Sequence, residues 1–287
     1  MCQSEYQREL KKQVQLPTIW TIPDQMWQKI RPLLGVEKEP GTPGRRPVPF
    51  RKVINGILFV LRTGCHWKAL PSCYGSGSTA HRRFQQWTQA GLIDAIVELM
   101  LRWYDRCRGI DWEWQAADTK LLAAPLGGQA TGPNPTTDRG KSGTKRHLLI
   151  DGRGVPLAFH LSAANRHDLK GLSRVLDPEG LFALRPEPSE GAPQQHLCLD
   201  KAYDAKEADK LLETLGYVGH IKRQGEDDVP GVGEPLYPAR RWKVERSISW
   251  LNNMRKLRVR WEKKAENYRG LWLLAAALIT YRRIVLG

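Results

Sequence analysis

Residues 241–255, with the sequence Arg-Trp-Lys-Val-Glu-Arg-Ser-Ile-Ser-Trp-Leu-Asn-Asn-Met-Arg, are predicted to form one helix. Ile248 and Leu251 give this helix an apolar side at helical spacing. Arg241 and Glu245 share another side, which carries a single carboxylate among basic residues. A solvated basic helix with an incidental glutamate would show the same pattern. The helix becomes informative because two aspartates further upstream end predicted strands.

The composition indicates a globular, basic protein. The 287 residues are 41% hydrophobic and 26% charged, enough for one large domain or two ordinary ones. Lysine and arginine exceed aspartate and glutamate by 45 to 30, a net charge of +15. The basic residues are spread along the chain, which favours a folded basic face and an anionic partner such as nucleic acid.

Zinc-binding, disulfide-rich, membrane-spanning and secreted classes of protein find little support. The five cysteines include no Cys-x-x-Cys pair, and His147, His160 and His167 lack the spacing of metal ligands, so a zinc ribbon and a disulfide framework are disfavoured. The most apolar run, Leu271–Ile279, is too short to cross a bilayer, and the N-terminus lacks the apolar core of a signal peptide. We therefore expect a cytoplasmic protein with no membrane segment.

The first part of the chain is predicted to be helical. Residues 1–18 are polar and expected to be flexible, and residues 19–108 contain several short amphipathic helices. One of them starts with Ser78 as N-cap and turns Arg82 and Arg83 outward. A helix-turn-helix-like DNA-binding domain would use such an arginine pair, and a plain helical bundle with a basic surface fits the pattern equally well.

From residue 109 the hydrophobic pattern becomes alternating, and the predicted order to residue 287 is β-β-β-α-β-α-β-α-α. Asp118 is predicted to end the first strand and Asp200 the fourth. Adjacent parallel strands that end in acids put two carboxylates at one sheet edge, and a helix lying across that edge could add Glu245. Asp204 is predicted to cap the helix that follows.

Three carboxylates gathered in one site would repel each other unless cations lie between them. Hard carboxylate oxygens favour Mg²⁺ or Mn²⁺. Two such ions about 3.5–4 Å apart can activate an attacking oxygen and stabilise the leaving one in phosphodiester chemistry. Each acid alone is weak support, because strand-end aspartates commonly cap turns and helical glutamates commonly lie on the surface.

A glycine-rich segment near residue 140 does not form a phosphate-binding P-loop. A Walker motif requires glycine five residues before Gly140, where Pro135 stands. We interpret this segment as a basic loop that leads into the second strand and contacts DNA phosphates through Lys141, Lys145 and Arg146.

Several segments together resemble bacterial insertion-sequence transposases of the Asp-Asp-Glu class, in the group numbered four/five. The resemblance is carried by Asn55–Trp67, Gly132–His147, Asp151–Pro156, Asp200-Lys-Ala-Tyr-Asp204 and Arg241-x-x-x-Glu245. It implies an α/β catalytic domain with a ribonuclease-H-like mixed sheet, preceded by the all-α domain. It also implies two Mg²⁺ or Mn²⁺ ions, metal-dependent cutting of double-stranded element ends, joining of the 3′-hydroxyls to target DNA, a homodimer on paired ends and association with the nucleoid.

Carried over by position, the resemblance makes Asp118, Asp200 and Glu245 the catalytic, metal-binding acids. The family's third motif is Tyr, two residues, Arg, three residues, Glu, six residues, Lys. Arg241 fits its arginine and is expected to contact DNA, whereas Asn252 replaces its lysine. The nearest basic residues, which become candidates for that DNA contact, are Arg255 and Lys256. Ala202 also stands where the family usually has glycine, and Tyr237 is spaced for Arg240 rather than Arg241.

Three functions remain in competition: an active transposase, a nuclease of the same fold without strand transfer, and a decayed copy that only binds DNA. The presence of all three acids argues against the decayed copy.

Overall fold

The computed structural model describes two compact units. One comprises Met1–Arg108 and Leu251–Gly287, and the other comprises Gly109–Trp250. The described residues are 21–37, 47–136, 139–177, 184–186, 193–221 and 238–287, with side chains described from Trp242 onward in the last segment. The N-terminal stretch 1–18, which the sequence predicts to be flexible, lies outside these residues.

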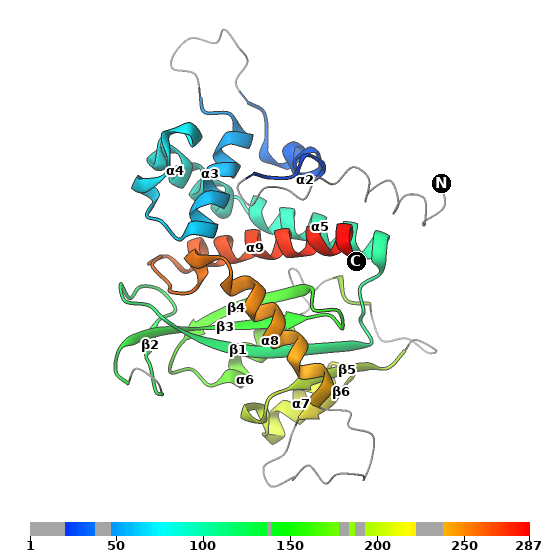
Figure 1. The fold of residues 1–287 in the computed structure, drawn as a ribbon. Coiled ribbons are helices and arrows are strands. Elements are labelled where there is room, and N and C mark those ends of the chain that lie inside the picture. Colours follow the sequence, from blue (N-terminus) through cyan, green and yellow to red (C-terminus); the bar gives the residue numbers. More distant parts are fainter. Residues whose placement is uncertain (1–20, 38–46, 137–138, 178–183, 187–192, 222–237) are drawn as a thin grey trace. The chain divides into compact units, whose positions relative to one another are not determined.

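The first unit is helical (Figure 1). Its α-helices and 3-10 turns are α2 (Asp24–Ile30), η1 (Arg31–Leu34), α3 (Phe50–Thr63), η2 (Trp67–Ala69), η3 (Ser72–Tyr74), α4 (Gly77–Gln89), α5 (Leu92–Arg108), η6 (Arg255–Leu257) and α9 (Ala265–Leu286). α3 ends at Gly64, whose φ of 73° belongs to the left-handed region that glycine adopts readily. The N-cap of α4 is Ser76 rather than Ser78, and the Ser76 side chain accepts the backbone N–H of Thr79.

Close packing explains why α4 begins earlier than predicted. A Cβ atom at Gly77 would lie 1.8 Å from the Trp67 carbonyl oxygen, so only glycine allows the first turn of α4 to approach η2 this closely. Residues 64–76, which hold η2 and η3, separate α3 from α4. This connection is longer than the short turn that is typical of a helix-turn-helix motif.

The second unit is built on a mixed β-sheet (Figure 1). Six strands form it among the described residues: β1 (Trp114–Ala123), β2 (Gly132–Pro133), β3 (Ser142–Ile150), β4 (Pro156–Ala163), β5 (Gln195–Leu199) and β6 (Tyr217–Ile221). β3 pairs antiparallel with β1, β2 and β4, whereas β5 runs parallel to both β1 and β6. This α/β architecture confirms the predicted fold class, and β2 is the strand that the sequence analysis missed.

Helices flank the sheet. They are α6 (Asp168–Val175), which packs on β3 and β4, α7 (Lys206–Thr214), which packs on β6, and α8 (Pro238–Asn252); the 3-10 turn η5 (Lys201–Tyr203) follows β5. Residues 251–287 belong to the helical unit, whereas the sequence analysis placed them with the sheet in a domain spanning 109–287. The reason is packing: α9 is apolar on nearly all sides and lies against α5. None of the helices among the described residues is both long and apolar enough to cross a membrane.

Candidate active site

Asp118 and Asp200 hold equivalent positions on two neighbouring parallel strands. The last pair in the register of β1 and β5 is Ala116 with Cys198, and each aspartate stands two residues beyond its member of that pair. The two aspartates therefore lie beside each other where β1 and β5 stop pairing. Open α/β sheets usually place their functional sites at such a point.

Two details of the predicted site need correction. Asp118 does not end its strand, because β1 stays paired with β3 as far as Ala123; what ends near Asp118 is the pairing with β5. Asp204 does not cap α7. This helix starts at Lys206, with Ala205 at the N-cap position and no side-chain hydrogen bond to the cap, because the intervening turn η5 displaces the helix start.

The buried phenol of Tyr203 lies within the field of both aspartates. Burial is the main cause that raises the pKa of Tyr203, and the negative charges of Asp168, Asp118 and Asp200 raise it further. Asp118 Oδ1 accepts the backbone N–H of Thr119 at 2.7 Å, which holds the carboxylate against β1. Asp200 and Asp118 are both half-buried, so both remain accessible to a ligand.

Glu245 lies on α8 and is exposed. Three neighbouring side chains bind α8 to the turn between β3 and β4: Lys243 Nζ donates to Gly152 O at 2.5 Å, Arg246 donates to Arg153 O at 3.0 Å, and Ser247 Oγ donates to Gly154 O at 2.7 Å. The turn lies beside the start of β1, because Ile150 pairs with Ala116. At helical spacing, Lys243, Arg246 and Ser247 share one side of α8, and Glu245 lies on the opposite side.

The strand register puts Asp118 and Asp200 at one point of the sheet, and the third predicted acid, Glu245, lies on α8. Nowhere in the described part of the chain do three His, Cys, Asp or Glu side chains form a group that could hold a metal ion. The side-by-side aspartates, with their hard oxygen atoms, fit a divalent cation such as Mg²⁺ or Mn²⁺.

Two of the predicted DNA contacts are wrong because their side chains are buried. Arg146 lies on the inner strand β3 and is 2% exposed. Lys256 is 4% exposed, and its Nζ lies 3.6 Å from Glu262 Oε1 inside the helical unit. Lys145 has little exposed surface as well: its Nζ lies 2.9 Å from Asp168 Oδ1.

The remaining basic candidates have more accessible side chains. Arg82, Lys141 and Arg255 are exposed. Arg83 is half-buried and lies over the ring of Phe50 at 5.1 Å. The side chain of the fifth candidate, Arg241, lies outside the described residues.

A polar network beside the aspartates was not predicted from the sequence, in which His147 was considered only as a metal ligand and set aside. Thr119, His147, Ser162 and Tyr203 form it by hydrogen bonds between side chains. Two signals in the sequence could have indicated it: Thr119 follows Asp118 directly, and Tyr203 lies within the Asp-Lys-Ala-Tyr-Asp string.

Comparison with known proteins identifies the family. Residues 22–97 match the model described as "Putative transposase of IS4/5 family", and residues 113–280 match the model described as "Transposase DDE domain". A putative transposase for insertion sequence element IS402 of Burkholderia cepacia is 32% identical over 54% of this chain and 70% of its own length. An uncharacterized 16.2 kDa protein of the same element is 39% identical over 41% of this chain and 83% of its own length.

Solved structures give a weaker likeness. The catalytic domain of the Mos1 mariner transposase aligns with 71% of this chain and 93% of its own at 14% identity, with a TM-score of 0.30. Such a score carries no argument, so the fold class rests on the observed strand order and on the family models. Because the DDE domain model alone covers more than half of the sequence, the chain belongs to the DDE transposases, in the IS4/5 family.

Proposed function

We propose that this transposase binds the terminal inverted repeats of its insertion sequence as double-stranded DNA, cleaves the element ends and joins the freed 3′-hydroxyls to target DNA. The observation that carries the proposal is the pair Asp118 and Asp200, side by side where β1 and β5 stop pairing, inside the region matched to the DDE domain. Phosphodiester chemistry needs paired carboxylates of this kind to hold cations at the scissile bond.

Membership of the DDE family implies a divalent metal. In our proposal Asp118, Asp200 and Glu245 are the ligands of two Mg²⁺ or Mn²⁺ ions. Such ions lower the barrier by activating the attacking oxygen and stabilising the leaving one. The protein's part is to hold the two aspartates at a fixed spacing and to supply Glu245 from α8, which Lys243, Arg246 and Ser247 bind to residues 152–154.

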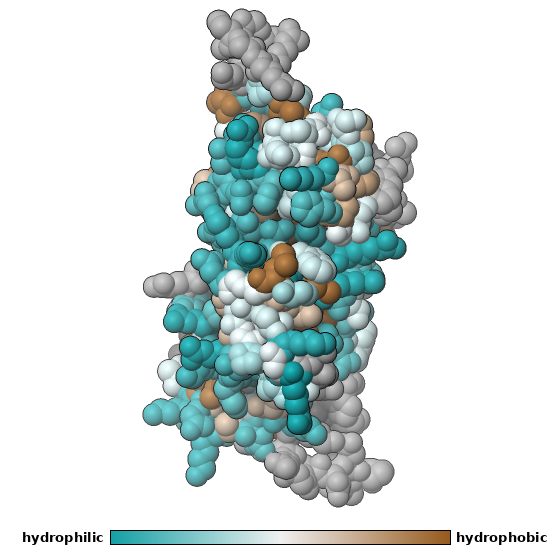
Figure 2. All heavy atoms as spheres, turned by 90° about the vertical axis from the view of Figure 1, so that its left-hand side faces the viewer, coloured by the Kyte–Doolittle hydropathy of each residue, from teal (hydrophilic) through white to brown (hydrophobic). Residues whose placement is uncertain are grey.

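Double-stranded DNA is the proposed partner because the chain carries a net charge of +15. The arginines of α4, Arg82 and Arg83, together with Lys141, Arg241 and Arg255, are the proposed contacts. The face drawn in Figure 2 is mostly hydrophilic, and its apolar residues occur in small separate groups. A surface of this kind suits a polyanion better than a large apolar partner.

The test replaces each acid with its isosteric amide: Asp118→Asn, Asp200→Asn and Glu245→Gln. Each change removes one negative ligand with little change of shape, so cleavage of element-end DNA with Mg²⁺ should be lost. DNA binding should persist or tighten, because a negative charge near phosphate has been removed. Asp204→Asn is the matched control, since Asp204 is an exposed carboxylate close to Asp200 in sequence, and it should cleave normally.

Different outcomes separate the competing functions. Full cleavage by one amide variant would exclude that residue from the site. Cleavage without joining, in the wild-type protein supplied with target DNA, would favour a nuclease. DNA binding without cleavage in the wild-type protein would establish the decayed, DNA-binding copy.

A homodimer is expected on paired element ends, because both ends must be held together for joining. Light scattering of the protein with paired end-DNA should give a mass of two chains per pair. A complex with only one chain on paired ends would contradict strand transfer and favour the nuclease.

A further inference from the structure

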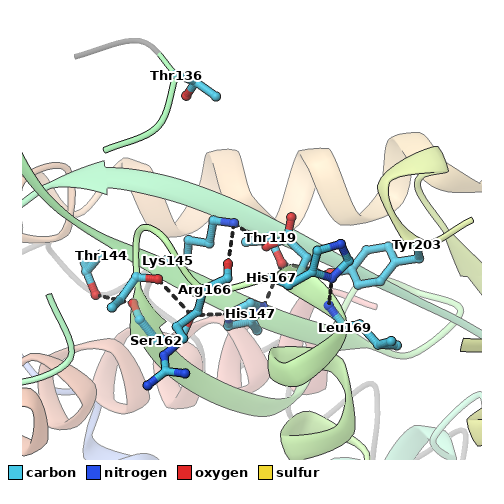
Figure 3. Close-up of polar contacts among 12 residues, drawn as sticks. Thr119, Thr136, Thr144, Lys145, His147, Ser162, Arg166, His167, Leu169 and Tyr203 are labelled. Atoms are coloured by element: carbon cyan, nitrogen blue, oxygen red, sulfur yellow. Dashed lines mark hydrogen bonds and ion pairs between the residues drawn. The ribbon is translucent and has the colours of Figure 1, made fainter. Parts of the chain in front are cut away.

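Three hydrogen bonds connect four elements of the sheet unit beside the aspartates (Figure 3). The Thr119 hydroxyl of β1 lies 2.8 Å from the Tyr203 phenol of η5 and 2.7 Å from His147 Nδ1 of β3. The other ring nitrogen, His147 Nε2, lies 2.8 Å from Ser162 Oγ of β4. Thr119 is therefore the link between the tyrosine and the histidine.

The bond between Thr119 and Tyr203 joins the two chain segments that carry the acids. Thr119 directly follows Asp118, and Tyr203 is folded back toward Asp200 by the bond from its N–H to Asp200 O at 3.0 Å. Backbone pairing between β1 and β5 has already ended at Ala116 and Cys198. Beyond that pair, this side-chain bond holds the continuation of β1 to the continuation of β5.

The histidine fixes the orientation of the threonine. Burial lowers the pKa of His147 to about 4, so the ring is neutral at pH 7 and has one N–H. If Nε2 donates to Ser162, whose hydroxyl can donate to Ala163 O at 3.5 Å, then Nδ1 accepts from Thr119 and Thr119 accepts from Tyr203. The Thr119 hydroxyl both donates and accepts in this arrangement, which serine can reproduce and valine cannot.

The ring itself has no room to move. A Cβ atom at Gly171 of α6 would lie 2.1–2.3 Å from three atoms of the His147 ring, so the helix backbone passes directly over the imidazole. Tyr203 and His147 are 2% and 1% exposed, too buried to touch DNA themselves. Their effect on the reaction has to pass through the aspartates.

We propose that Thr119 and Tyr203, oriented by His147, are positioning residues that set the spacing of Asp118 and Asp200 and thereby the affinity of the site for a divalent cation. The inference rests on the proposed function, which makes the two aspartates metal ligands. Groups that orient metal ligands from behind typically change metal affinity by about 10- to 100-fold when they are removed. Thr119 and Tyr203 act on the aspartates through the backbone segments that carry them, so the lower end of this range is expected.

The test measures Mn²⁺ binding to the full-length protein by electron paramagnetic resonance of the free ion, without any cleavage reaction. Tyr203→Phe and Thr119→Val should each weaken binding about tenfold, at the lower end of that range. Thr119→Ser should bind as the wild type does. Raising the Mn²⁺ concentration should restore DNA cleavage in Tyr203→Phe but not in Asp118→Asn.

Tyr217→Phe is the matched control. The Tyr217 hydroxyl is also buried and donates to Gln115 Oε1 at 2.9 Å, but Tyr217 pairs with the start of β5, at the end away from Asp200. It should lose stability without losing Mn²⁺ affinity. Equal loss of affinity in this control and in Tyr203→Phe would reduce the effect to general destabilisation and overturn the inference.

Three further outcomes would overturn the inference, and each identifies the step that fails. Wild-type Mn²⁺ affinity in Tyr203→Phe and Thr119→Val, with binding lost in Asp118→Asn and Asp200→Asn, would remove the positioning role and leave the proposed function intact. Wild-type affinity in both asparagine variants would remove the proposed metal site, and the positioning role with it. A Thr119→Ser variant as weak as Thr119→Val would show that the hydroxyl is not the group responsible.

Discussion

His147 links the folded state to pH. Burial is the main cause that lowers its pKa to about 4; His160 and Lys145 also lower it, whereas Asp168 opposes the shift. In the unfolded chain a histidine titrates near pH 6.5. As the pH falls through the window from about 6.5 to 4, the unfolded chain binds a proton that the folded chain does not. The free energy of unfolding therefore decreases across this window and is largest above it.

His147→Gln should remove this dependence. The difference in unfolding free energy between wild type and variant should shrink by up to about 3 kcal/mol between pH 7 and pH 4, from 1.36 kcal/mol per pKa unit. Urea unfolding at several pH values measures it. Tyr217→Phe, which introduces no group that titrates in this range, should be less stable by a nearly constant amount. Parallel wild-type and His147→Gln curves would contradict the prediction.

At the scale of elements, local sequence patterns predicted which helices and strands form better than they predicted where each one begins and ends. The alternation of apolar residues predicted the five main strands, and the helix predicted between the third and fourth of them is α6. Boundaries moved where tertiary contacts decide them, as at Gly77, whose close approach to η2 sets the start of α4. β1 likewise outlasts the predicted strand because its antiparallel partner β3 continues to pair with it.

The site was predictable only in part, for a physical reason. Strand order places Asp118 beside Asp200, and that order follows from the pattern of strands and helices. The place of Glu245 depends on how α8 docks on a turn, which helical periodicity does not encode. The burial of Arg146 and of Lys256 could not be predicted either. The sequence around a buried lysine or arginine does not differ from that around an exposed one.

Arg255 and Lys256 are adjacent basic residues of η6 with opposite expected roles. Lys256→Met should destabilise the helical unit by roughly 3 kcal/mol, because it leaves the buried Glu262 carboxylate without its cation. Arg255→Ala removes an exposed side chain and should change stability by less than about 0.5 kcal/mol while weakening DNA binding. Thermal unfolding and DNA titration of both variants are the measurements. A stable Lys256→Met protein with weakened DNA binding would reverse the assignment.

At the scale of the whole molecule, the net positive charge and the transposase family both fit the proposed action on DNA. Most of the sequence matches two transposase models, and the second match, residues 113–280, crosses from the sheet unit into the helical unit at residue 251. The proposed chemistry therefore draws on a match that includes both units. The net charge of +15 belongs to the entire chain, and exposed members such as Arg82 and Lys141 come from different units.

This charge predicts how DNA binding responds to salt. Each phosphate that a lysine or arginine neutralises releases condensed counterions, so the logarithm of the binding constant falls linearly with the logarithm of salt concentration. For about 6–10 phosphate contacts, affinity should drop by about 10³ to 10⁵ between 50 and 200 mM salt. Fluorescence anisotropy with labelled element-end DNA measures the slope, and Arg82→Ala should reduce its magnitude by about one contact. A flat response would exclude nucleic acid as the main ligand, because no polyanion can be bound by a basic surface without displacing its counterions.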